Sequence, residues 1–380
     1  MLTYLYLTQL VLNLALCHRL TTVTKVLYGI PLPPSQVHRL AHLGEKLGPK
    51  SISILVDDIS QLPAANVFRS IAGFPLHIFI KVDTGYHRAG IPVGTEAFQG
   101  LVKRVFELES DKTGVLAGFY SHAGHSYGGD SAIGAMETLV EEIAGLEKAA
   151  AEAISLHCLT STVPRYILSV GASPTTTSIE YLHKDDNTPI AKKLISIIER
   201  VQKACSLELH AGVYPFLDMQ QLATHASPSA AADRNGRQGP IGLPDMALTI
   251  LVEVASVYSS REKPEALVAA GTLALGREPC KSYDGWGIVS DWGWGWDTKT
   301  SGRSVWKIGR ISQEHCVLTE DIDINKEAQT GLQVGQKLRI FPNHACVASA
   351  GFSWYLIVDS SSVKERQDVI VDVWVRCRGW

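Results

Sequence analysis

Short apolar runs of strand character alternate with longer segments of helical character between residues 21 and 232. In the segments 132–153 and 190–204, apolar residues recur at helical spacing along one face. Strands that alternate with helices form a parallel sheet, either open or closed into a barrel. The class is therefore α/β. The predicted strands are 25–29, 51–56, 76–82, 115–120, 166–171 and 206–210.

These six predicted strands are fewer than a complete (β/α)8 barrel requires. Such a barrel has eight strands and takes about 250 residues. If this part of the chain forms a barrel, two βα units are absent. We therefore expect an incomplete (β/α)8-type barrel; the family resemblance given below implies that the units are missing at its N-terminus.

The pattern changes after residues 225–245, which are small, polar and rich in Gly and Pro, as in a linker or exposed loop. Strands with few helical stretches follow, which predicts an all-β domain. The expected domains are an apolar N-terminal segment, 1–20, a barrel domain, 21–235, and a β domain, 236–380. The strands expected in the β domain are 247–259, 266–275, 287–291, 304–319, 336–350, 354–359 and 369–380.

The chain is close to electrically balanced, with 35 Lys and Arg against 38 Asp and Glu, and no basic run stands out. Nucleic acid and anionic membrane surfaces are therefore not expected partners. The seven cysteines are scattered and odd in number. They indicate free or metal-bound thiols in a reducing, cytoplasmic setting rather than a disulfide framework.

The first twenty residues are apolar and carry no charge before His18. They lack the basic start of a secretory signal and are short for a membrane span. A targeting or anchoring role is one interpretation. A buried helix, or a chain start unrelated to the rest, is favoured over it.

Charged residues gather where the predicted strand 76–82 ends: Lys81, Asp83, His87 and Arg88. The C-terminal ends of barrel strands face the active site. The alternative is a solvated loop that turns at glycine.

Three further segments follow predicted strands. In 118–128, Tyr120, His122, His125 and Tyr127 could serve a site; two histidines three apart can bind a metal, although the glycines favour a polar loop. In 169–177 and 208–216, Gly, Ser and Thr follow strand ends, where backbone amides and hydroxyls suit a phosphate.

His344 and Cys346 lie two apart in the predicted strand 336–350. On a strand, residues i and i+2 share a face. A thiolate and an imidazole together suit Zn²⁺, with water or substrate completing the coordination. Ordinary strand residues are the alternative.

Taken together, these segments resemble the eukaryotic, fungal-type D-serine dehydratase family, pyridoxal 5'-phosphate (PLP) enzymes of the alanine-racemase-like fold. The resemblance runs in order from about residue 26 to the C-terminus. The matching segments are VLYGIPLPPSQVHRL, KVDTGYHRAG, YSHAGHSY, SVGASPT, ELHAGVYPF, GREPC, SQEHCVL and PNHAC.

The resemblance implies a barrel with PLP at its C-terminal end, a β domain, a small D-amino acid substrate and a homodimer. It also implies roles for single residues. Lys81, Arg88, Tyr120 and Tyr127 match residues near the cofactor; Gly171, Ser173, Gly212 and Tyr214 match the phosphate site; His344 and Cys346 match the zinc pair.

The implied reaction converts D-serine to pyruvate and ammonia, with zinc assisting loss of the hydroxyl. D-Threonine aldolases share this fold and a metal, but their metal site resembles His-x-Asp, so Cys346 favours the dehydratase. An aldolase-like enzyme remains the alternative.

The family's Schiff-base lysine, in an Arg-Pro-His-x-Lys-Thr-His-like motif, has no counterpart in the sequence. Lys25 falls on the wrong strand and Lys81 matches a different position, so the catalytic lysine is unknown. One hypothesis is a truncated or mis-started chain without dehydratase activity. The rivals are a PLP- or zinc-binding module and an enzyme in which another lysine serves.

Overall fold

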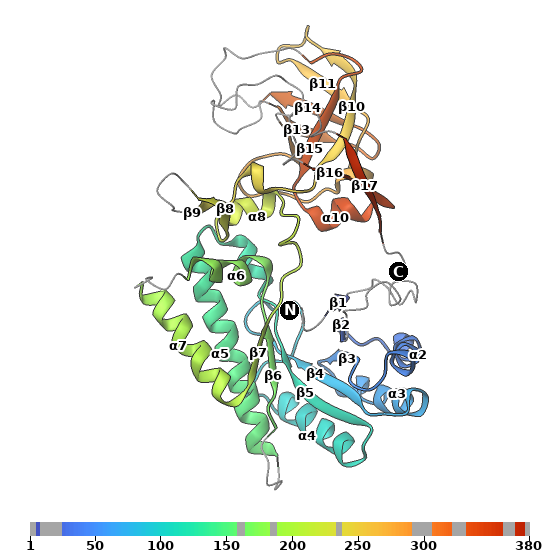
Figure 1. Ribbon diagram of the computed structural model, residues 1–380, viewed down its shortest axis with the longest axis vertical. Coiled ribbons are helices and arrows are strands. Elements are labelled where there is room, and N and C mark those ends of the chain that lie inside the picture. The colour runs from blue at the N-terminus through green and yellow to red at the C-terminus, as the bar shows by residue number, and fades with distance from the viewer. Residues whose placement is uncertain are drawn as a thin grey trace.

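The computed structural model describes residues 5–7, 25–157, 164–182, 188–232, 238–290, 306–320, 332–359 and 369–376. A parallel sheet with its helices occupies the lower part of Figure 1, and an antiparallel β domain occupies the upper part. This arrangement confirms the α/β class and the alanine-racemase-like fold with a C-terminal β domain. The boundary between the domains near residue 235 stays a prediction.

The lower sheet has seven parallel strands in sequence order, and it forms a half-barrel that does not close among the described residues. All six predicted strands are confirmed. The strands are β1 (Leu5–Leu7), β2 (Val26–Pro31), β3 (Ile52–Val56), β4 (Leu76–Lys81), β5 (Gly114–Tyr120), β6 (Ile167–Val170) and β7 (Ser206–Leu209).

Helices connect these strands, and both predicted helices are confirmed as α5 and α7. The helices of this domain are α2 (Val37–Leu47), α3 (Ala64–Ala72), α4 (Glu96–Ser110), α5 (Ala132–Leu156), α6 (Ser173–Thr177), α7 (Pro189–Ala204) and α8 (Met219–Thr224). Short 3-10 turns are η1 (Pro34–Gln36), η2 (Ile59–Gln61), η3 (Gly124–Gly128), η4 (Ser178–Tyr181) and η5 (Leu243–Asp245).

The first strand departs from the expected buried helix. Leu5 pairs with Val26 and Leu7 with Tyr28, both in parallel register. An apolar Leu-Tyr-Leu run can extend an open sheet edge, where unpaired backbone groups accept another strand. The helix interpretation is therefore wrong for these three residues, and the rest of 1–20 lies outside the described residues.

Alternation along the strands separates two faces of the sheet. Ile78, Ile80 and Phe119 belong to the large core between the sheet and its helices. Phe79 and Tyr120 belong to a smaller cluster on the opposite, inner face. Since side chains alternate along a strand, a residue two positions beyond Phe79 also points to the inner face. The same alternation puts the residues that end β4 and β5 on the inner face of the sheet, where the candidate site lies.

The β domain is a closed antiparallel barrel with the order β10-β11-β14-β13-β12-β15. It confirms the all-β prediction. Its strands are β10 (Ile250–Tyr258), β11 (Glu265–Val268), β12 (Gly287–Val289), β13 (Trp306–Ile311), β14 (Cys316–Glu320) and β15 (Lys337–Pro342).

Four parts of this region differ from the predictions. The predicted strand 304–319 is two antiparallel strands, β13 and β14. The expected loop 225–245 contains a hairpin, β8 (Pro228–Ala232) with β9 (Gln238–Pro240). The predicted strand 266–275 ends early and continues as α9 (Thr272–Leu275). The predicted strand 336–350 ends at Pro342, because proline has no N–H for a further ladder bond, and α10 (Ala345–Ala350) follows.

A second hairpin, β16 (Trp354–Val358) with β17 (Ile370–Val375), extends from α10 toward the C-terminus. One of its faces is apolar and open, with exposed fractions from 48% to 74%. We call this the hairpin face. It consists of Trp354, Leu356, Val371, Val373 and Val375.

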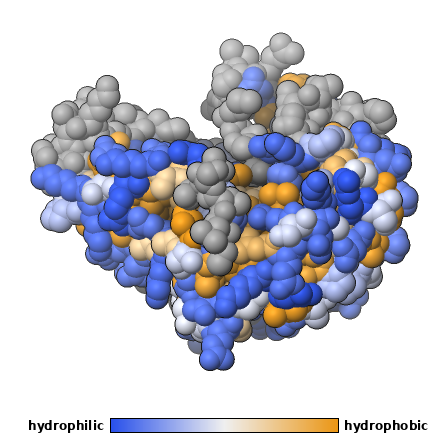
Figure 2. Space-filling model, turned by 90° about the horizontal axis from the view of Figure 1, so that it is seen from below, coloured by the Kyte–Doolittle hydropathy of each residue, from blue (hydrophilic) through white to orange (hydrophobic). Residues whose placement is uncertain are grey.

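Hydrophobic residues also gather in the middle of the molecular face that is seen from below, with hydrophilic residues on both sides (Figure 2). Within the described part of the chain, no helix has the length and apolar character to cross a membrane.

Candidate active site

Two predicted residues end neighbouring strands side by side. Lys81 and Tyr120 are the last residues of β4 and β5, are paired in register, and are both buried. The Lys81 Nζ lies 5.1 Å from the centroid of the Tyr120 ring. Burial lowers the pKa of Lys81, and the charge of Arg88 lowers it further, against an opposing effect of Asp57. The Lys81 amine is therefore more easily deprotonated than an ordinary lysine.

A further residue of the site, His210, follows β7 and was not predicted from the sequence. Its ring stacks on Tyr120, with centroids 4.5 Å apart and planes 4° apart. The ring of His122 continues this arrangement, 5.9 Å from His210 and 20° from parallel. We call these three rings the ring stack. Glu208 and His210 are polar residues two apart at the end of the predicted strand 206–210. Their shared strand face is the pattern that could have identified His210 as a site residue.

Both histidines of the ring stack are uncharged at neutral pH. Burial lowers the pKa of His122 to about 4, and the charge of Arg88 adds to this effect. Burial also lowers the pKa of His210 well below its usual range, with a smaller effect from His122. The His122 Nδ1 lies 2.9 Å from the carbonyl oxygen of Gly171, which fixes the orientation of this ring.

A buried polar chain runs from His210 into the inner face. The Ser169 hydroxyl donates a hydrogen bond to Glu208 Oε1 at 2.9 Å and lies 3.2 Å from His210 Nδ1. If the serine proton points to Glu208, the serine oxygen accepts from Nδ1–H, and Nε2 then carries the lone pair. Burial raises the pKa of Glu208 to about 7.

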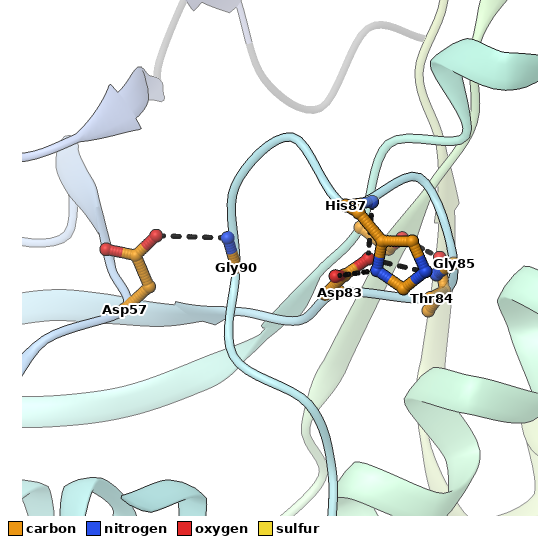
Figure 3. A network of polar contacts seen from close by, with 7 residues as sticks. Asp57, Asp83, Thr84, Gly85, His87 and Gly90 are labelled. Carbon is orange, nitrogen blue, oxygen red and sulfur yellow. Dashed lines mark hydrogen bonds and ion pairs between the residues drawn. The ribbon is translucent and has the colours of Figure 1, made fainter.

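The loop after β4 carries Arg88 and is held by two carboxylates (Figure 3). Asp83 accepts hydrogen bonds from the amides of Gly85 and His87 and contacts the His87 ring at 2.8 Å. Asp57, which follows β3, accepts from the Gly90 amide at 3.1 Å. These contacts fix the conformation of the loop. They also place Arg88 at the rim of the site.

Gly90 is required for this loop. Its φ is +111°, and a Cβ there would lie 2.7 Å from the backbone of Val82 and Asp83. The exposed Arg88 guanidinium lies 4.9 Å from the centroid of the Tyr86 ring. His125 is also exposed, with its ring 5.7 Å from Tyr86. The loop interpretation of the two histidines therefore fits the structure better than a metal pair.

The proposed phosphate residues lie on two loops that meet. Gly171 has a φ of +136°, and a Cβ there would lie 2.4 Å from His210 O and Thr176 Oγ1. Ser173 begins α6, and its hydroxyl accepts from the Val213 amide at 3.1 Å. Gly212 has nothing within 4 Å of a Cβ position, so space remains beside it. Tyr214 is 47% exposed and stands apart from the buried residues.

Tyr127 connects the phosphate loops to the β domain. Its half-buried side chain, on η3, lies beside Ser173, Gln221, Asp218 and Cys346. Burial is the main cause of its raised pKa. Tyr127 therefore stands between the proposed phosphate site and the proposed metal pair.

The proposed metal pair does not lie on a strand. His344 is the N-cap of α10, and Cys346 is in its first turn, so the expected shared strand face is wrong. The Asp218 carboxylate accepts hydrogen bonds from both the Gln221 amide, at 2.8 Å, and the Ala345 amide, at 2.9 Å. One carboxylate thus caps α8 and α10 and joins the pair to the barrel domain.

The electrostatics also bring the pair together around Asp218. Burial raises the pKa of Asp218, and the charge of His344 opposes this rise. Partial burial, followed by the charge of Asp218, raises the pKa of the Cys346 thiol, although this residue is exposed at the surface. Within the described ranges, no group of three or more His, Cys, Asp or Glu side chains could hold a metal ion. Zinc at His344 and Cys346 stays a prediction.

Comparisons with known families agree with both halves of this architecture. Residues 22–184 match the N-terminal domain of alanine racemase, and residues 247–358 match the serine dehydratase domain. The D-serine dehydratase of Schizosaccharomyces pombe is 33% identical over 365 residues, which is 94% of this chain and 74% of that protein. The D-serine dehydratase of Saccharomyces cerevisiae is 30% identical, over 94% of this chain and 76% of that protein.

A solved structure shows the same fold. The D-threo-3-hydroxyaspartate dehydratase from Delftia sp. HT23 aligns with a TM-score of 0.70 at 24% identity, over 97% of this chain and 83% of that chain. A mutant of that enzyme with a cysteine replaced by alanine, described as metal-free, aligns equally well, with a TM-score of 0.70.

Proposed function

Because the chain belongs to the D-serine dehydratase family, we propose that it is a PLP-dependent lyase that converts D-serine to pyruvate and ammonia. The observation that carries this proposal is the ring stack beside the buried amine of Lys81, at the C-terminal ends of parallel strands. In folds of this kind, active sites are built at that end.

The residues of the site fit PLP. The ring stack offers a flat surface to an aromatic ring, and stacked aromatic contacts stabilise such a ring by about 0.5–1.5 kcal/mol. The open space beside Gly212 and the Ser173 hydroxyl suit a phosphate group. When bound, PLP supplies an electron sink for the electrons released at Cα of the amino acid.

The side chains of this chain would bind and orient the reactants. Burial and the charge of Arg88 lower the pKa of Lys81, so its amine loses a proton more readily than an ordinary lysine and can then act as a proton acceptor. Arg88 at the rim supplies a permanent positive charge for anionic groups of cofactor or substrate. His210 can present an uncharged nitrogen, whose orientation is held by Ser169 and Glu208.

We further propose His344 and Cys346 as ligands of a catalytic zinc. The donor types fit, since imidazole and thiolate both bind Zn²⁺ and a catalytic site leaves positions for water or substrate. Such a zinc would act as a Lewis acid that assists departure of the β-hydroxyl group. The Delftia dehydratase is described in a metal-free form as a cysteine mutant, which supports a metal in that enzyme.

No lysine is assigned as the covalent partner of PLP. Among the described residues, Lys81 is the only buried lysine. We propose that it lies beside the cofactor, in keeping with its family position. Borohydride reduction of the PLP-loaded chain, followed by peptide mass spectrometry, identifies any lysine that bonds to it.

We also propose that the chain forms a homodimer. The exposed hairpin face supports this proposal, because monomeric proteins rarely leave a contiguous apolar patch in water.

The test of the proposed function is turnover by the purified chain with PLP and zinc. D-Serine and, as the control, L-serine are supplied, and pyruvate is measured. The lyase proposal predicts pyruvate from D-serine only, with a lysine of this chain other than the family's serving as the covalent partner of PLP. Bound PLP and zinc without pyruvate would overturn the lyase proposal in favour of a binding module.

A further inference from the structure

Helix α5 carries one charged side chain on its buried face, Glu142. This residue is 1% exposed. Neither carboxyl oxygen makes a hydrogen bond of ordinary geometry with any described residue. An unpaired buried carboxyl is costly, so a helix that only packs against a sheet has no reason to carry one. The reaction described above does not use it.

The carboxyl lies where two strands of the site end. Its neighbours are the Ser121 hydroxyl and the backbone amides of Ala123 and Gly171. Ser121 follows β5 directly and Gly171 follows β6 directly. Three donors from two neighbouring loops therefore surround one acceptor group.

These neighbours are connected to the site. Ser121 also contacts the Thr84 hydroxyl at 2.5 Å, which adds the loop after β4. His122 lies between Ser121 and Ala123 in the chain, and its ring contacts the Gly171 carbonyl at 2.9 Å. A shift of either loop would move the ring stack and the proposed phosphate residues together.

We propose that Glu142 is a positioning residue, whose carboxyl holds the loops after β5 and β6 in the arrangement that the ring stack and Ser173 require. This inference rests on the proposed function for its relevance to catalysis, but the positioning itself concerns the chain alone. Glu142 would affect catalysis only through the positions of these two loops.

The ionisation state of Glu142 should control how firmly it holds the loops. Burial raises its pKa to about 7, so acid and carboxylate are both present near neutrality. The carboxylate can accept from all three donors, whereas the acid has one oxygen committed to its proton. The titratable neighbour is Tyr120 on β5, whose pKa the charge of Glu142 helps to raise.

The test compares hydrogen exchange in the full chain without cofactor. Wild type, Glu142→Gln and Glu141→Gln are measured at pH 6 and pH 8, with rates corrected for intrinsic exchange. Glu141 is the exposed neighbour on α5 and serves as the matched control. PLP affinity of the same three proteins is measured in parallel by fluorescence quenching.

In Glu142→Gln, we expect about tenfold faster exchange in peptides covering 121–124 and 171–174, the effect of removing the charge that the three donors face. Wild type should be better protected there at pH 8 than at pH 6, and Glu141→Gln should match it. Glu142→Gln should also bind PLP more weakly.

Equal exchange of wild type and Glu142→Gln in both segments would overturn the inference. If Glu142→Gln does not fold, the wild-type comparison decides alone, and equal protection at pH 6 and pH 8 would overturn it. Wild type that binds no PLP would contradict the proposed function, while the exchange result would still decide the role of Glu142.

Discussion

Tyr120 and His210 stack face to face across β6, with ring centroids 4.5 Å apart and planes 4° apart. They end β5 and follow β7, and both belong to the inner side of the half-barrel. Two residues far apart in sequence thus pack into one aromatic stack, and its Tyr120 ring lies beside the Lys81 amine. The proposed cofactor position depends on this aromatic stack.

Removing the His210 ring should weaken PLP binding. His210→Ala removes the middle ring of the stack, which holds Tyr120 and His122 in place. The loss of one stacked aromatic contact corresponds to about three- to tenfold in affinity. Fluorescence titration with PLP measures the change. The exposed His38, replaced by alanine, is the control. Equal affinities of the two variants would contradict this position for the cofactor.

Gly171 and Gly212 should respond differently to alanine. Gly171→Ala forces a side chain into positive φ and against His210 O, which we expect to lower the free energy of unfolding by about 3 kcal/mol. Gly212→Ala meets open space and should leave the stability within about 0.5 kcal/mol of wild type. Urea unfolding followed by circular dichroism measures both. Similar losses in the two variants would show that the loop geometry is wrong.

Replacing either proposed zinc ligand should lower zinc affinity. His344→Ala and Cys346→Ala each remove one protein donor, and we expect losses of at least about tenfold, the scale on which even outer-sphere changes act. Competition with a chromophoric chelator measures the affinity. His315→Ala, at an exposed site in the β domain, is the control. The metal-pair proposal fails if both variants hold zinc as wild type does.

Acid should destabilise the fold through His122. Its pKa is about 4 in the folded protein and near 6.5 when unfolded, so the unfolded state binds the proton more tightly. The stabilisation is therefore complete above pH 6.5 and is lost as the pH falls toward 4. His122→Asn should show a smaller decrease of the thermal midpoint over this interval. A parallel decrease in both proteins would count against a neutral buried His122.

Charge on the hairpin face should separate the proposed dimer. Leu356 and Val373 face each other across β16 and β17, and both are exposed. Leu356→Asp should leave the monomer fold intact and increase the monomer fraction, because an interface cannot bury an unpaired carboxylate cheaply. Light scattering after size exclusion measures the mass. Lys263→Asp, at an exposed turn, is the control; an unchanged mass of Leu356→Asp would exclude this face.

The strands and helices of the barrel domain were predictable because each has a clear pattern of apolar residues, either a short continuous run in a strand or one helical face. The β4 run LHIFIK is buried at nearly every position, as a strand covered on both faces should be. Lys81 and Tyr120 were found for a related reason. Parallel strands end at one edge, so polar residues just after apolar runs converge there.

Other parts of the site depend on contacts that a linear pattern does not contain. His210 was counted as a strand residue, and its stacking on Tyr120 depends on which strands become neighbours. Glu142 interrupts an otherwise apolar helix face, and only packing shows which amides it meets. At β15 the apolar pattern continues past Pro342, but the backbone turns into α10 there.

The most direct measurement is a crystal structure of the full chain grown with PLP and zinc. We predict density for the PLP ring against Tyr120 and His210, with its phosphate between Gly171 and Gly212. Density for PLP elsewhere, or none at saturating concentration, would contradict the account of this site.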